Sequence, residues 1–173
     1  MIVGVEDRSR LTPAEAYELV FAFNNRRYVE SQGYSVTANM FTRRDVFDRV
    51  GMFRVGVSED LDWGQRASAL GFRIRYTPDA VVTHPARRHW RDLLRKWRRL
   101  TSESYMLVCE QPYGKVWWFA RSWLILLSTF AHIPTVLRSK ELSSFDQRSK
   151  AIGGLVKLRI WRFVECNRKL MNI

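Results

Sequence analysis

The hydrophobic pattern changes along the chain from short mixed segments to long helical stripes. Residues 2–5 form a short apolar run that predicts a strand. The following run Thr12-Pro13-Ala14-Glu15 has a capping threonine, a proline suited to the first helical position and an acid three residues after the cap, so it predicts a helix start. Apolar residues spaced by three and four positions continue this helix, which we expect to end before Gly33.

The middle of the chain predicts short strands that alternate with short helices. Strands are expected at 36–41, 72–76 and 80–83, and helices at 42–50 and 61–70. In the run 72–76, apolar residues alternate with arginines at the period of a half-buried strand. Each predicted helix is followed by a glycine, which suits a helix C-terminus. Alternation of this kind is typical of an α/β protein.

From residue 88 onward the pattern is helical. Large apolar side chains share one face of the run that begins there, and arginines and a lysine cover most of the rest. Residues 116–137 are the most apolar stretch, and residues 155–171 predict a basic amphipathic helix. We therefore expect an α/β domain at 1–110 and a helical, membrane-associated tail at 111–173.

Composition adds a strong positive charge to this picture. The chain of 173 residues has a formal net charge of +12, which indicates an anionic partner such as a nucleotide diphosphate, an anionic lipid or a nucleic acid. Its two cysteines, Cys109 and Cys166, lie far apart and form no CxxC pair, so neither a disulfide scaffold nor a zinc site is indicated.

The acidic run Ser58-Glu59-Asp60 stands at the mouth of the helix predicted at 61–70. Carboxylates at this position lie near unsatisfied backbone N–H groups and the positive end of the helix dipole, which keeps them ionised and fixes their direction. Taken alone, the run is better explained by simple capping of the helix, because caps are common. Its neighbours along the chain decide between these interpretations.

An ordered series of motifs surrounds the acidic run. The series comprises Thr37-Ala38-Asn39, Arg43 or Arg44, Val50-Gly51-Met52-Phe53, Glu59-Asp60-Leu61-Asp62, Arg66, Gly71, Tyr76, Pro78, Ala80, Val81 and His84. In order and spacing this series resembles the family 2 glycosyltransferases. The resemblance extends more loosely from residue 2 to about residue 100. The resemblance implies part of a GT-A (Rossmann-like) fold, the acceptor-side half, followed by the apolar and basic helices.

The resemblance also implies a mechanism. The second acid of the motif, here Asp60, is the general base that takes the proton of the acceptor hydroxyl in a single displacement with inversion. Glu59 shapes the acceptor pocket or binds backbone N–H groups. His84 contributes to a divalent cation, Mg²⁺ or Mn²⁺, that holds the diphosphate of the nucleotide-sugar donor. The acceptor is a glycan or a lipid-linked sugar of a cell-envelope polysaccharide.

Further residues are candidates for substrate binding. Asn39 and Arg66 occupy motif positions, and Arg87 and Arg88 are placed to neutralise the departing diphosphate. A solvated helix start explains the two arginines equally well. Trp63 is a possible sugar platform, but it shares a helical face with Ala67 and Leu70, which favours a position in the core.

The sequence departs from the family in its nucleotide-binding part. No base-binding strand and loop and no Asp-x-Asp precede Asn39, and the run Asp60-Leu61-Asp62 belongs to the catalytic motif. We therefore expect a truncated enzyme that is weak or inactive without an N-terminal half, with a separate chain as the candidate partner that supplies it.

The tail predicts contact with a membrane. Residues 116–137 are long enough to span a bilayer, but Arg121 and Pro134 interrupt them, so we favour an interfacial or re-entrant helix with Trp117, Trp118 and Trp123 at headgroup depth. A buried helix remains an alternative. Basic flanking helices suit an anionic surface at the cytoplasmic face of the inner membrane. Two other functions stay open, a membrane-surface protein without catalysis and a nucleic-acid-binding module on residues 87–99, although no nucleic-acid motif supports the latter.

Overall fold

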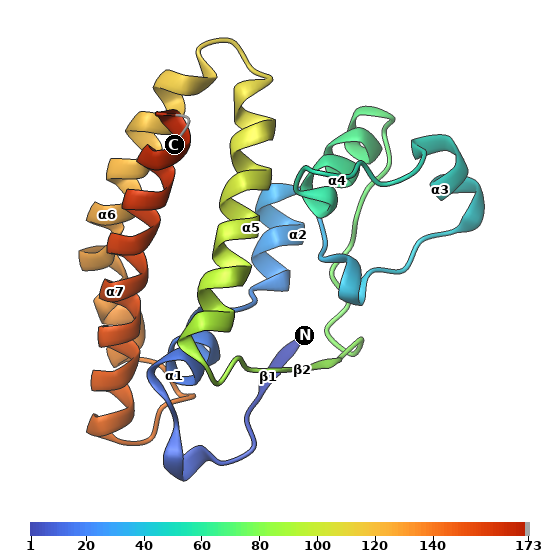
Figure 1. Cartoon of the computed structure of the whole chain (residues 1–173). Helices are drawn as coiled ribbons and strands as arrows, with labels where there is room; N and C mark the ends of the chain where they lie inside the picture. Colours follow the sequence, from blue (N-terminus) through green and yellow to red (C-terminus); the bar gives the residue numbers. More distant parts are fainter. Residues whose placement is uncertain (172–173) are drawn as a thin grey trace. The chain divides into compact units, whose positions relative to one another are not determined.

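The computed structural model describes residues 1–171, which form helices, loops and one pair of short parallel strands (Figure 1). The elements are β1 (Ile2–Gly4), α1 (Pro13–Phe21), α2 (Asn25–Gln32), α3 (Arg44–Val50), α4 (Glu59–Ala69), β2 (Thr83–Pro85), α5 (Trp90–Cys109), α6 (Gly114–Leu137) and α7 (Phe145–Leu170). Short 3-10 turns lie at Arg8–Arg10 and Thr37–Asn39. The backbone N–H of Ile2 donates to the carbonyl of Val82 (2.9 Å), and that of Ala86 donates to the carbonyl of Gly4 (2.8 Å).

The chain divides into two compact units. The α4 unit comprises residues 1–2 and 23–84, and the helical unit comprises residues 3–22 and 85–173. The predicted boundary near residue 110 coincides with the end of α5 at Cys109, but α5 packs with α1, α6 and α7 in one unit. As a boundary between functional domains, it stays a prediction.

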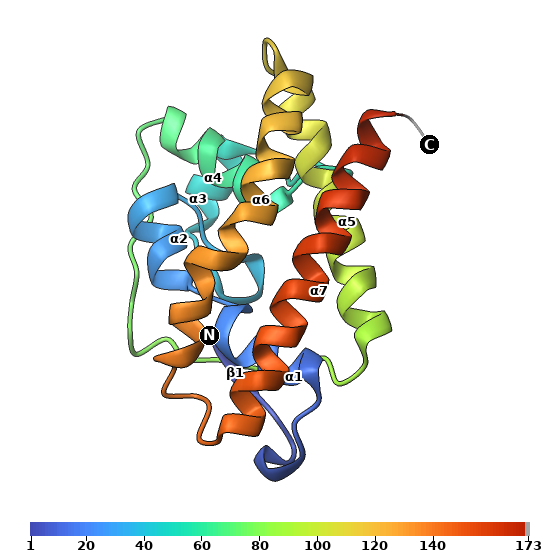
Figure 2. The same ribbon diagram turned by 90° about the vertical axis from the view of Figure 1, so that its left-hand side faces the viewer.

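In the helical unit, α6 and α7 pack side by side along much of their length, and α1 and α5 complete the core (Figures 1 and 2). The helix start predicted at Thr12 is confirmed. The Thr12 Oγ1 accepts from the backbone N–H of Glu15 (3.2 Å), and a Glu15 carboxylate oxygen accepts from that of Thr12 (2.9 Å). The helix expected to end before Gly33 ends at Phe21, and a second helix, α2, forms from Asn25 to Gln32, which the sequence analysis did not predict.

The α4 unit has a small core. Val50, Trp63 and Ala67 are buried there, with Phe47 and Phe53 among the aromatic side chains packed around them. The expected helix over 42–50 is confirmed as α3, and the helix expected over 61–70 as α4, each within a few residues.

Several predicted strands are absent from the described part of the chain. The run 36–41 contains a 3-10 turn, the run 72–76 is unpaired, and the strand predicted at 80–83 is shifted to Thr83–Pro85. A strand needs a neighbour to satisfy its backbone groups, and no described strand pairs with the runs 36–41 and 72–76. The α/β prediction therefore holds only in part, because the structure is mostly helical with one small sheet.

Candidate functional site

Three carboxylates lie in the first turn of α4: Glu59, Asp60 and Asp62. The N-cap residue, Ser58, makes no side-chain capping hydrogen bond, while its carbonyl accepts from the N–H of Asp62 (2.9 Å). The first N–H groups of a helix have no partner within the helix, and the helix dipole makes this end positive. The environment predicted for the acidic motif, the mouth of a helix, is therefore confirmed.

The carboxylate of Asp60 is held by the backbone. Its Oδ1 accepts a hydrogen bond from the N–H of Thr37 (2.8 Å), in the 3-10 turn. The phenol of Tyr34 lies in the same environment: burial first, and then the nearby Tyr28 and Asp60, raise its pKa to about 12. Tyr34 is a site residue that the sequence did not reveal.

Gly64 makes this arrangement possible. A Cβ atom at position 64 would lie 2.6 Å from the Cβ of Tyr34 and 2.9 Å from the carbonyl oxygen of Gly33. Real Cβ atoms do not approach other heavy atoms so closely, so only glycine allows α4 to pack against the 33–34 segment. This close approach is what brings the N–H of Thr37 within reach of Asp60.

Asp62, in contrast, is committed to ion pairs. Its Oδ1 accepts from Arg54 (3.0 Å) and its Oδ2 from Arg66 (2.9 Å), and its side chain is only 7% exposed. Arg66 also donates to the carbonyls of Val50 (2.6 Å) and Met52 (2.8 Å). Its guanidinium therefore fixes the 50–52 connection to α4, and its role in substrate binding stays a prediction.

Trp63 is 3% exposed, and its Nε1 donates to the carbonyl of Gly51 (3.0 Å). The interpretation as a core residue is confirmed, and in this conformation Trp63 offers no platform for a sugar. Leu70, predicted to face inward with it, is 50% exposed, so that part of the prediction is wrong.

Asn39 lies beside a hollow in the α4 unit. Its Nδ2 donates to the carbonyl of Ala80 (2.9 Å). The hollow has a volume of about 130 Å³, and Asn25, Arg75 and Tyr76 also line it. The Oδ1 of Asn25 is buried, and the described residues offer it no hydrogen-bond partner. Sequence reasoning missed Asn25, because an asparagine at a helix start indicates only capping.

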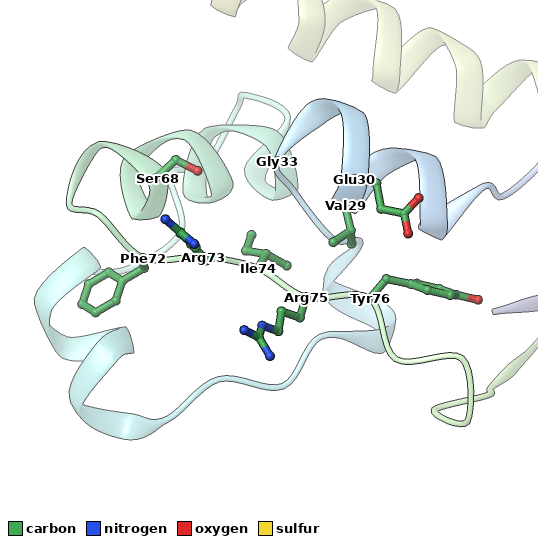
Figure 3. Close-up of a pocket in the computed structure, with 9 residues that line it drawn as sticks. All are labelled: Val29, Glu30, Gly33, Ser68, Phe72, Arg73, Ile74, Arg75 and Tyr76. Carbon is green, nitrogen blue, oxygen red and sulfur yellow. The ribbon is translucent and has the colours of Figure 1, made fainter.

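A second hollow, of about 470 Å³, is lined by residues 72–76 together with residues of α2 and α4 (Figure 3). Val29 and Ile74 adjoin at its wall, and Arg75 and Tyr76 belong to both hollows. Apolar, aromatic and guanidinium groups thus line both hollows, a composition that suits a polar ligand with apolar faces.

His84 packs its ring against that of Phe23, with the ring centroids 5.1 Å apart. In the part of the chain that is described, no group of three or more His, Cys, Asp or Glu side chains could hold a metal ion. The residues present therefore do not form a complete metal site, and the predicted shared cavity of Asp60 and His84 stays a prediction.

Arg87 and Arg88 belong to the helical unit. Arg87 donates through its backbone N–H (2.7 Å) and its Nη1 (2.9 Å) to the carboxylate of Glu18, which is 1% exposed. Lys96 donates to the same carboxylate (3.0 Å), and burial lowers its pKa. Arg88 is exposed, with its guanidinium 3.8 Å from the carboxylate of Glu6. Neither phosphate-binding role is tested by these contacts.

Helix α6 has one buried and one exposed apolar face. It is long and apolar enough to cross a membrane, by length and composition alone. Trp117 and Trp123 are exposed, whereas Trp118 is 1% exposed and donates its Nε1 to the carbonyl of Cys166 (3.0 Å). Trp118 is thus a core residue in this structure, against the expectation that all three tryptophans lie at headgroup depth.

Comparison with known proteins gives two matches. A family model described as glycosyl transferase family group 2 matches residues 7–161, which include α5, α6 and much of α7. Glycosyltransferase AglE of Haloferax volcanii is 30% identical over 91 residues, which cover 51% of this chain and 30% of that protein. No solved structure matches the chain.

Proposed function

The chain belongs to glycosyl transferase family group 2, and from this premise we propose that it transfers a sugar from a nucleotide-diphosphate donor to a glycan or lipid-linked acceptor with inversion. The supporting observation is the position of Asp60 in the first turn of α4, with one oxygen held by the N–H of Thr37. We also propose that the chain contributes to a GT-A fold.

In the proposed reaction, Asp60 accepts the proton of the acceptor hydroxyl. That oxygen forms a bond to the anomeric carbon as the bond from this carbon to the diphosphate breaks on the opposite face. A carboxylate suits the role because it needs only to accept a proton as the hydroxyl becomes nucleophilic. The hydrogen bond from Thr37 orients the group, and orientation of a reacting group lowers the entropic part of the barrier.

The hollow lined by Asn25, Asn39 and Tyr76 is the proposed sugar-contacting surface. The buried side-chain oxygen of Asn25, Oδ1, would accept a hydrogen bond from a sugar hydroxyl. This bond would relieve the cost of leaving a buried polar atom unsatisfied. Glu59, adjacent to Asp60, would help to shape the acceptor side.

The nucleotide side of the reaction needs groups beyond those described. Asp62 is engaged by Arg54 and Arg66, so Asp60-Leu61-Asp62 does not serve as an Asp-x-Asp metal motif. Turnover is therefore proposed to require a nucleotide-binding half, and the chain spans only 30% of the length of AglE.

Members of the family commonly use a divalent cation, which would stabilise the charge of the departing diphosphate. His84 is the proposed contribution of this chain to a Mg²⁺ or Mn²⁺ site. Arg66, Arg87 and Arg88 are the proposed substrate-binding cations.

We further propose that the chain works at an anionic membrane surface. The exposed face of α6 is apolar, and the net charge of +12 favours anionic lipids. The cytoplasmic face of the membrane is the proposed location, since nucleotide-sugar donors and anionic leaflets meet there.

The experiment is a transfer assay with Asp60→Asn. The 173-residue chain is co-expressed with a nucleotide-binding half taken from a family member, and radiolabelled sugar from a panel of nucleotide donors is followed into a lipid or glycan fraction. Asparagine keeps an oxygen for the N–H of Thr37 but cannot act as a base, so transfer should fall by about 10²–10⁴-fold.

The matched control is Asp48→Asn, which removes an exposed acid whose only described salt bridge is with Arg44 on the surface of α3. It should leave transfer within about twofold of the wild type. Equal transfer by Asp60→Asn and the wild type would contradict the proposed base.

A further inference from the structure

Arg162 of the helical unit lies within electrostatic range of two further arginines, and none of the three has a described acidic partner. Among the described residues, Arg121 of α6 and Arg159 and Arg162 of α7 have no carboxylate within salt-bridge distance. Arg162 is only 9% exposed. The Nε atoms of Arg159 and Arg162 are buried, and no described residue accepts a hydrogen bond from either. We call these three residues the arginine cluster.

Further orphaned polar groups lie beside the cluster on α5. The guanidinium of Arg162 lies over the ring of Trp97, 4.0 Å from its centroid. The Nε1 of Trp97 and the Oγ1 of Thr101 are buried, and each lacks a hydrogen-bond partner within residues 1–171. Residues four apart on a helix share a face, so both groups stand on the same side of α5.

The surroundings of Arg162 destabilise its charged form. Burial lowers the pKa of Arg162 to about 10, and the charges of Arg159 and Arg121 contribute in the same direction. Arg162 nevertheless stays protonated at neutral pH. Buried cations without counter-charge and buried donors without acceptors are both costly. The buried Glu165 pairs with Arg98 and Arg168, so a buried Arg162 with no described carboxylate within salt-bridge distance calls for a physical explanation.

We propose that the arginine cluster, with Trp97 and Thr101, binds the phosphate group of a ligand. The site offers Arg159 Nε, Arg162 Nε, Trp97 Nε1 and Thr101 Oγ1, each of which can donate a hydrogen bond. A phosphate has enough oxygens to accept from all of them and a charge that matches several arginines, whereas a single carboxylate has two oxygens. This site lies in the helical unit and does not depend on the proposed sugar transfer.

Two sources could supply such a phosphate: a soluble phosphate or diphosphate, and a lipid headgroup. Arg121 stands on α6 between the exposed apolar side chains Trp117 and Leu124. A phosphate attached to an apolar chain would contact both kinds of surface, whereas inorganic phosphate would contact only the arginines. The two arms of the test distinguish these sources.

The test measures binding to the full chain. One arm titrates inorganic phosphate and pyrophosphate by calorimetry, against chloride at equal ionic strength. The other arm measures flotation with phosphatidylcholine vesicles that contain or lack phosphatidic acid. Phosphate-specific binding in either arm supports the site, and the arm that responds identifies the source.

Arg162→Met is the decisive variant, because it keeps an apolar chain of similar length and removes the charge. It should weaken phosphate binding by about tenfold or more, and in phosphate-free buffer its melting temperature should equal or exceed that of the wild type. The matched control Arg138→Met removes an exposed charge at the end of α6 and should change affinity by about twofold or less.

Three results would overturn the site: no phosphate-specific binding in either arm, an affinity of Arg162→Met equal to that of the wild type, or equal losses in Arg162→Met and Arg138→Met. If Arg162→Met does not fold, Arg121→Met is judged by the same affinities, since its side chain is less deeply buried.

Discussion

In the helical unit, four helices bury an extended apolar core, with Leu93, Leu155 and Leu158 fully enclosed. In the α4 unit, short helices and loops bury only Val50, Trp63 and Ala67 as a core cluster, and arginine–carbonyl bonds and glycines hold the chain in place. Apolar area is the main source of folding free energy. The unit with the candidate catalytic acid therefore depends for its stability on a few specific contacts, and the loss of any one of them should lower its free energy of unfolding.

The largest expected effect is in the helical unit, at its buried ionic group. Glu18→Gln leaves Arg87 and Lys96 without their shared counter-charge, so the free energy of unfolding should fall by about 3–5 kcal/mol. Urea denaturation measures it. Glu141→Gln is the control, because its pair with Arg8 is exposed and worth about 0–1 kcal/mol. Similar losses in both variants would show that burial does not determine how much an ion pair contributes to the stability of this unit.

A smaller effect is expected from overpacking in the α4 unit. Gly64→Ala places a methyl group against Tyr34 and Gly33, which should lower the free energy of unfolding by about 1–3 kcal/mol and reduce transfer. Denaturation followed by tryptophan fluorescence measures the loss.

Gly153→Ala is the matched control for Gly64→Ala. A Cβ at position 153 of α7 meets no atom within 4 Å, so alanine should be neutral or stabilise the helix by up to about 1 kcal/mol. If Gly64→Ala behaved in the same way, the close packing of α4 on the 33–34 segment would be refuted.

The smallest effect concerns alkaline pH. Because the folded pKa of Tyr34 is about 12 against an ordinary value of 10.0, its phenol stays protonated when the unfolded chain has begun to ionise. Its contribution to stability is thus complete below about pH 10 and is lost as the pH rises toward about 12.

Tyr34→Phe should remove this part of the alkaline loss, and the wild type should show one tyrosinate absorbance step more than the variant near the top of that range. A step near pH 10 in its place would mean that Tyr34 is not enclosed beside Asp60.

Local signals in the sequence were enough to predict several elements. The capping box of Thr12 and Glu15 and the glycine after α3 act over one helical turn. The helix ends that they mark are therefore determined by neighbouring residues. The apolar helical period likewise predicted α5 and α6 close to their observed starts, whereas the helix predicted at 155–171 begins ten residues earlier, at Phe145 of α7.

Contacts between distant segments could not be predicted in this way. The bond from Thr37 to Asp60 depends on the packing of Gly64, and the burial of Glu18 depends on Arg87 and Lys96 from far along the chain. The runs 36–41 and 72–76 have strand-like patterns, but a pattern does not provide the neighbouring strand that a sheet requires.

The account rests on the Asp60 carboxylate being fixed by the N–H of Thr37, and amide NMR of the ¹⁵N-labelled chain tests this most directly. The Thr37 amide should be protected from hydrogen exchange in the wild type and in Asp60→Asn, and it should lose that protection in Asp60→Ala. An unchanged Thr37 amide in Asp60→Ala would contradict the proposed orientation of the catalytic base.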